Sequence, residues 1–251
     1  MKRLTPVLVA ALAFAGAAAP AAAETEHVTR TVSLGPGGTL HLNSFSGRVT
    51  IAGTDQSDVV IDAVRHGTRD QLDRITLDIQ ADGSSVRIEA NRRERSWFDW
   101  GRDNVVETDL DIKVPRRTNL DIKLFSASLD VRRVEGSHTV NTFSSHATLD
   151  EVTGSVHAKS FSGPIEVRAS TWQDRQTIDV ETFSGNVQLH LPESARGSVN
   201  FNSFSGRLNT SLPVTVQSSR RKEFSGQLGQ GGDGRGAIRV RTFSGNATLD
   251  R

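Results

Sequence analysis

The sequence predicts an all-β protein. It is expected to be a single-domain β-solenoid of stacked two-strand coils of about 18–22 residues, with Phe-Ser-Gly corners and a less regular N-terminal portion. Three observations support this fold class. A Phe-Ser-Gly tripeptide recurs along the chain, and apolar and polar residues alternate on both sides of it. The composition, with 22 glycines and neither cysteine nor tyrosine, is typical of a turn-rich β protein.

The tripeptide or a near relative occurs eight times, and from Phe125 onward the copies follow one another at 18, 18, 22, 21, 20 and 19 residues. The positions four and six residues after each phenylalanine are apolar in 14 of 16 cases, with polar residues between them. The positions five and three residues before it form a second alternating series, broken badly only before Phe224. Each unit therefore contains two strands, each with one buried face.

The two strands of a unit are out of phase, so a bend must lie between them at Phe-Ser-Gly. Glycine tolerates a positive φ at such a bend, and serine can bond neighbouring backbone amides. Stacking places phenylalanine on phenylalanine, and we expect an inward-facing corner ladder because each phenylalanine has the same parity as the apolar positions four and six residues after it. An exposed aromatic stripe would also promote association. An outward ladder is the alternative. The ladder residues are Phe45, Phe125, Phe143, Phe161, Phe183, Phe204, Phe224 and Phe243.

The N-terminal portion is less regular than the rest. We divide the chain into a signal peptide at 1–23 and a solenoid domain at 24–251, with an irregular part at 24–118 and regular repeats at 119–251. The irregular part is expected to contain, in order, a strand at 24–34, a turn at 35–38, one copy of the repeat at 40–51, a strand at 59–61, a helical turn at 69–74, a hairpin of 75–80 and 86–90, and a strand at 105–114 closed by Pro115.

The first 23 residues have the features of a secretory signal peptide. Lys2 and Arg3 precede an apolar run, and Ala21 to Ala23 supply small residues for cleavage before Glu24. A membrane anchor is the alternative, but the run is short and ends in a cleavage pattern. The sequence thus predicts export through the Sec pathway to the periplasm or the cell exterior, with no membrane span after cleavage. The remaining 28 basic and 29 acidic side chains do not favour nucleic-acid binding.

The search for catalytic chemistry finds no candidate, so we predict no enzyme, no cofactor and no metal site. The serine of the repeat recurs eight times and is interpreted as structural. His138 and His157 are nearly one coil apart, but chance stacking explains this better than a metal site. Asp109 and Asp111 share a strand face, which we interpret as the solvated face because Leu110 and its alternating neighbours are apolar.

The most unusual segment, 91–102, combines four arginines with two of the three tryptophans. Such residues can stack on sugars or anchor an interface. Alternatively, the segment folds back and covers the flank of the solenoid. The variable corners opposite Phe-Ser-Gly are either spare loops or a second binding region. The candidate binding residues are Arg92, Arg93, Arg95, Trp97, Phe98 and Trp100.

The pattern resembles the DUF4097 family of adhesin-type or toastrack β-solenoids. The resemblance rests on Val-x-Thr-Phe-Ser-Gly-x-Val-x-Leu, on Asp111-Ile112-Lys113-Val114-Pro115 before Leu120-Asp121-Ile122, and on Leu191-Pro192 before Gly197-Ser198-Val199. It implies a solenoid of the bacterial envelope without known catalysis. We therefore expect an exported, non-enzymatic adhesin-like or scaffold module, with a surface glycan or an envelope protein as candidate partner. The alternatives are an accessory protein of envelope-stress signalling that binds a membrane regulator and, third, a polysaccharide-acting β-helix enzyme.

Overall fold

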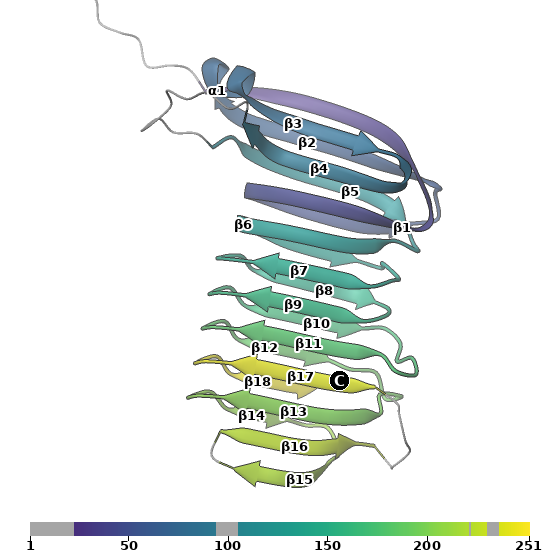
Figure 1. The fold of residues 1–251 in the computed structure, drawn as a ribbon, viewed down its shortest axis with the longest axis vertical. Helices are drawn as coiled ribbons and strands as arrows, with labels where there is room; N and C mark the ends of the chain where they lie inside the picture. Colours follow the sequence, from purple (N-terminus) through teal and green to yellow (C-terminus); the bar gives the residue numbers. More distant parts are fainter. Residues whose placement is uncertain (1–22, 94–104, 221, 230–235) are drawn as a thin grey trace, which may run out of the picture.

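The computed structural model describes residues 23–93, 105–220, 222–229 and 236–251, and it shows a tall stack of β coils (Figure 1). The 18 described strands belong to one continuous sheet, which is mostly parallel. The sheet forms two walls because β1 (Ala23–Thr54) and β6 (Asn119–Arg132) each run through the corner from one wall to the other. The predicted all-β solenoid is confirmed. The expected signal peptide lies outside the described residues, apart from Ala23.

The first wall consists of strands that lead into the Phe-Ser-Gly corner, continued at the lower end by a hairpin. From top to bottom in Figure 1 they are β3 (Ile75–Ala81), β4 (Gly83–Arg93), the middle of β1, the first half of β6, β7 (His138–Thr142), β9 (Val156–Ser160), β11 (Thr177–Thr182), β17 (Ala237–Thr242), β13 (Gly197–Ser203), β16 (Glu223–Leu228) and β15 (Val214–Arg220).

The second wall consists of strands that leave the corner, preceded by an antiparallel group at the upper end. They are the start of β1, β2 (Asp58–Thr68), β5 (Glu107–Pro115), the end of β1, the second half of β6, β8 (Ala147–Val152), β10 (Ile165–Ala169), β12 (Val187–His190), β18 (Ala247–Asp250) and β14 (Leu208–Thr210). Among the described residues, no helix is long and apolar enough to cross a bilayer.

The helical turn and the hairpin of the irregular N-terminal part lie where the sequence predicts them, whereas β1 runs through the predicted turn at 35–38 and β2 is longer than the predicted strand at 59–61. The helical turn is α1 (Arg69–Arg74). Thr68 and Gln71 cap its N-terminus through a reciprocal capping box. The hairpin of β3 and β4 turns at Asp82, whose carboxylate accepts bonds from the two following serine N–H groups. The bond from the Ser85 N–H, followed by those from the Ser84 hydroxyl, the Ser84 N–H and the Ser85 hydroxyl, lowers the pKa of Asp82 to about 2. The antiparallel strands widen the upper end of the solenoid (Figure 1).

The coils are not stacked in chain order at the C-terminal end. The last coil, formed by β17 and β18, lies between the coil of β11 and β12 and that of β13 and β14. In Figure 1 the yellow strands therefore lie between green ones. The copy at Phe224 is not a coil, because β15 and β16 form an antiparallel hairpin that pairs with β13. The order of the coils along the stack therefore differs from their order along the chain.

The core is a column of aliphatic side chains between the two walls. In each regular strand the burial alternates with a period of two, as in β7, β9 and β11. The inward positions lie above one another in register, so that Leu120, His138 and Val156 occupy one row. His138 is fully buried in this otherwise apolar row. His157 points to the opposite side of its wall, so these two histidines do not form a site.

The corner glycines are explained by close backbone approach. A Cβ on Gly163 would lie 1.7 Å from the carbonyl oxygen of Ser145, and one on Gly185 would lie 2.0 Å from that of Gly163. A positive φ, the reason expected from the sequence, occurs in this motif at Gly47, where φ is 106°. At the lower corners glycine is required because the next coil's backbone occupies the space of a side chain.

Replacing Gly163 with alanine should therefore lower the free energy of unfolding by about 1–3 kcal/mol or more, because the added methyl group overlaps a backbone oxygen. Urea titration measures this difference. Gly67→Ala is the matched control, since the nearest atoms to its Cβ would belong to the side chains of Gln71 and Val106, at 3.3–3.5 Å, and not to backbone. Equal stability of both variants would contradict the close-approach explanation.

His138 should make the solenoid sensitive to mild acid. Burial lowers the pKa of His138 from 6.5 to about 4, so the unfolded chain binds more protons than the folded one between these pH values. Stability rises with pH in such a window, and it is lost as the pH falls from about 6.5 to about 4, by on the order of 3 kcal/mol. In His138→Val the unfolding midpoint should depend less on pH across this range. Valine is the substitute because Val156 already occupies the neighbouring position of the same row. An unchanged slope would show that other groups set the acid sensitivity.

Candidate functional site

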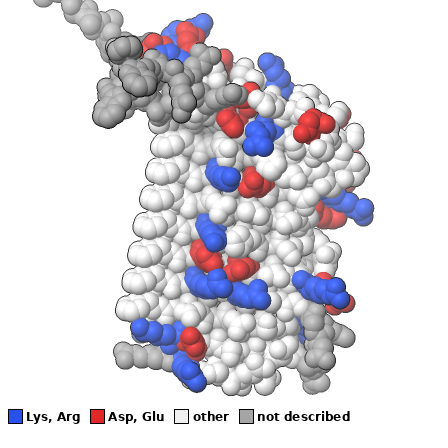
Figure 2. Space-filling model, viewed as in Figure 1, with Lys and Arg blue, Asp and Glu red and all other residues white. Residues whose placement is uncertain are grey.

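Seven phenylalanines form a continuous ladder on the outside of the corner. In stack order they are Phe45, Phe125, Phe143, Phe161, Phe183, Phe243 and Phe204, with ring centroids 4.7–5.0 Å apart. Six such steps make the ladder roughly 29 Å long. The rings are 39–57% exposed, so the expected inward orientation was wrong. In Figure 2 the uncharged left edge of the molecule corresponds to the side of this corner.

The rings point outward because the inside of the corner is already filled. The residue before each ladder phenylalanine is buried and, in six of the seven copies, carries a hydroxyl group. The Ser160 hydroxyl accepts from the Gly163 N–H at 2.9 Å, and it lies 2.8 Å from the carbonyl oxygen of the same glycine. At the next corner the Thr182 hydroxyl donates to the carbonyl oxygen of Gly185 at 2.7 Å. These bonds close the turn, and the buried glycine leaves no room for a ring.

Backbone hydrogen bonds carry the stacking through the corner itself. The N–H of Ser162 donates to the carbonyl oxygen of Phe143, and that of Ser184 donates to Phe161, both at 3.0 Å. Because every corner repeats these bonds, the rings take the spacing of the strands. Below Phe45 the planes of successive rings differ by only 1–2°. The faces of the inner rings are therefore covered by their neighbours, and the ring edges form an apolar ridge.

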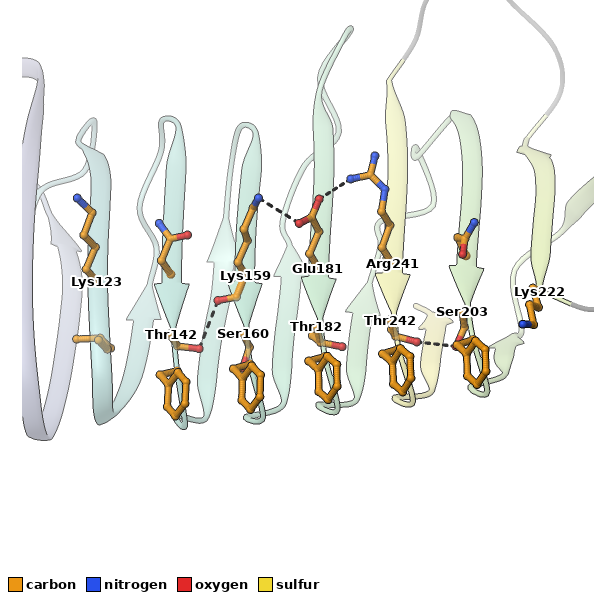
Figure 3. A pocket seen from close by; sticks show the side chains of 18 residues that line it. Lys123, Thr142, Lys159, Ser160, Glu181, Thr182, Ser203, Lys222, Arg241 and Thr242 are labelled. Atoms are coloured by element: carbon orange, nitrogen blue, oxygen red, sulfur yellow. Dashed lines mark hydrogen bonds and ion pairs between the residues drawn. The ribbon is translucent and has the colours of Figure 1, made fainter.

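A shallow groove of about 870 Å³ runs beside the ridge on the first wall (Figure 3). One side of the groove is formed by the lower phenylalanines of the ladder. The other is formed by outward side chains two residues before each phenylalanine, which come from the ends of the strands in the first wall. These are Lys123, Asn141, Lys159, Glu181, Arg241 and Asn202. Lys222, from the turn immediately before β16, completes the lower end.

The groove has an excess of positive charge, since its lining contains four basic side chains and one acidic one. The Lys159 Nζ lies 3.1 Å from Glu181, and Arg241 pairs with the same carboxylate. The hydrogen bond from Lys159, together with Arg241, lowers the pKa of Glu181, which is therefore ionised at neutral pH. Lys222 lies 3.9 Å from the ring centre of Phe204 and covers the last ring face by a cation–π contact.

The sequence reasoning missed these basic residues as a group. Their common signal is the position two residues before the repeated phenylalanine, which is outward in every strand of the first wall. The signal was hidden because the phenylalanines were expected to face inward, so that no site was sought at this corner. Phe224, expected in the ladder, instead lies in the hairpin opposite Phe201 and packs against the core.

The residues predicted to bind a ligand lie mostly outside the described part of the chain. Arg95, Trp97, Phe98 and Trp100 belong to the segment 94–104, and their predicted role stays a prediction. The backbones of Arg92 and Arg93 end β4 and pair with β3. Earlier residues of the same strand, Glu89 and Asn91, line a hollow of about 440 Å³ beside Phe45 and Phe125. The strand that leads into the predicted segment thus adjoins the upper end of the ladder.

The other polar groups considered from the sequence are on the solvated surface. Asp111 is exposed, and Asp109 accepts a bond from the Arg48 N–H at 2.7 Å. Asp121 pairs with His41 at 3.0 Å on the outside of the first wall. Across the described residues there is no group of three or more histidine, aspartate or glutamate side chains that could hold a metal ion.

Comparisons with solved structures return proteins of similar length and low identity. They include a "putative cell adhesion protein" from Clostridium sporogenes (12% identity, TM-score 0.49, 90% of this chain and 99% of that chain). A "putative lipid binding protein" from Parabacteroides distasonis (10%, 0.35, 90% and 96%) and a "putative adhesin" from Bacteroides fragilis (9%, 0.30, 90% and 96%) are similar in the same way. These likenesses carry no argument about function. No curated protein matches the sequence.

A family model matches the part of the chain that contains the regular coils below β6 and the C-terminal hairpin. The matched residues are 133–250, and the model is described as Toastrack DUF4097. The stacked coils and the corner motif of these residues are the features on which the sequence resemblance was based. The resemblance is thereby confirmed, and residues 133–250 match the Toastrack DUF4097 family.

Proposed function

We propose that this protein is an exported, non-enzymatic binding module of adhesin-like type, which contacts the cell envelope through the phenylalanine ladder and the groove beside it. The observation that carries the proposal is the exposure of seven stacked rings along one straight edge. A soluble protein rarely exposes a contiguous apolar patch of this extent unless the patch contacts a partner. The corner geometry also holds the ridge rigid before any partner binds, which reduces the entropy lost on binding.

The serine hydroxyls at the corner support a structural role rather than nucleophilic chemistry. Ser144 and Ser162 bond to each other across adjacent coils at 2.9 Å. Ser162 and Ser205 also lie 3.4 Å from carbonyl oxygens of the neighbouring coil. A catalytic serine instead needs a base that takes its proton. The repeated hydroxyls therefore stabilise the corner that carries the ladder.

The ladder can be tested by co-sedimentation of the purified protein with isolated bacterial envelopes. Phe143→Ser/Phe183→Ser should weaken binding about tenfold or more, because two exposed ring edges can no longer be buried against the partner. The matched control is Val216→Ser, which removes an even more exposed apolar side chain from β15, away from the ladder.

Thermal unfolding of both variants separates loss of binding from loss of fold. Equal envelope binding by the wild-type protein, the ladder variant and the control would overturn the proposal. The same is true if the wild-type protein does not sediment with envelopes.

A further inference from the structure

The apolar ridge is bordered by basic side chains along the first wall, and on the side of the second wall arginines border its two ends. On the side of the first wall lie Lys123, Lys159, Arg241 and Lys222, with Glu181 as the single acid. On the side of the second wall, the residue three positions after each ladder phenylalanine is exposed, and none of these residues is acidic. In stack order they are Arg48, Ser128, His146, Pro164, Asn186, Asn246 and Arg207.

The charges lie behind the ridge rather than on it. Lys159 precedes Phe161 by two residues of an extended strand, which places its Cα roughly 6–7 Å further from the corner. The same offset applies to Lys123 and Arg241. Long basic side chains can extend along an apolar surface and place their charged ends at its border. In Figure 2 the charged side chains beside most of the uncharged left edge lie inward of it, and basic side chains reach the edge at its lower end.

An anionic lipid surface has acyl chains inside and phosphate groups outside. The ridge matches it, because its apolar edge can meet the acyl chains while the basic side chains behind the edge meet the phosphates. We infer that the ladder lies along the surface of an anionic bilayer. Its ring edges contact the acyl boundary, and the flanking lysines and arginines contact headgroup phosphates. This inference rests on the proposed function and names the envelope component that the ladder binds. A straight ridge of roughly 29 Å fits a planar surface, whereas a small ligand is usually enclosed in a concave pocket.

Other occupants fit this surface less well. A sugar ring stacks on an aromatic face, but each inner face is covered by the next ring, and Lys222 covers the face of Phe204. A second copy docked ladder to ladder would bring basic borders together, and Glu181 is the single acid of the groove that could offset them. The excess of positive charge therefore favours an anionic partner.

The test is co-sedimentation with vesicles of phosphatidylcholine containing about 30% phosphatidylglycerol, compared with vesicles of phosphatidylcholine alone. The wild-type protein should bind the anionic vesicles, more weakly at high salt. Lys123→Gln/Lys159→Gln/Arg241→Gln should lose about 100-fold in partition, since each of the three basic residues near an anionic surface contributes about fivefold. Lys113→Gln/Arg117→Gln removes two cations of β5 and its following turn, outside the groove, and should bind like the wild-type protein.

Glu181→Gln supplies a variant with the opposite expected sign. Removing the single acid of the groove should strengthen binding to anionic vesicles about fivefold, which a misfolded variant would not do. Equal partition of the wild-type protein to both kinds of vesicle would overturn the lipid assignment, and so would an unchanged affinity of both groove variants. Ladder-dependent binding to envelopes without binding to anionic vesicles would also overturn it, while the broader proposal of a binding module would remain.

Discussion

The structure depends on backbone hydrogen bonding between coils that continues through the Phe-Ser-Gly corner. The N–H group of the corner serine bonds the coil next to it, as Ser162 does to Phe143. A solenoid has no single compact core, so each coil is stabilised mainly by its two neighbours. Such pairing demands that backbones approach closely at every corner. Gly163 and Gly185 permit this approach because they have no Cβ.

The exposed ladder is a consequence of the same constraint. Once the coils pair in register, a side chain that cannot fit inside the corner must stack above its equivalents at the strand spacing. The buried hydroxyl of Ser160 or Thr182 occupies the interior of the corner and closes the turn. The phenylalanine is then outside, in a position that exposes its edge. Because the corner already fixes the position of each ring, an apolar ridge with this regularity costs little additional conformational entropy, and it is available for binding.

The two ends of the stack solve the problem of unpaired strand edges differently. At the upper end, antiparallel strands and α1 widen the sheet beyond the repeat. At the lower end, the hairpin of β15 and β16 pairs with β13, and the exposed strand β15 is polar apart from its valines. Polar edge strands discourage further pairing. Because the last coil is inserted before the hairpin, the chain end is paired on both sides and does not form an edge.

The sequence by itself determined the all-β solenoid, the two strands of each coil, the helical turn at Arg69–Arg74 and the stacking of equivalent phenylalanines, because alternation and spacing are local properties of a chain. It did not determine the stack order, since the coil of Phe243 can pair equally well with any coil of the same pattern. It also did not reveal that the ladder faces outward. The parity of Phe161 with Ile165 suggested burial, and the space that decides its orientation is taken by Ser160 and by the backbone of the neighbouring coil. Only the tertiary structure therefore placed Lys123, Lys159 and Arg241 beside an exposed aromatic ridge.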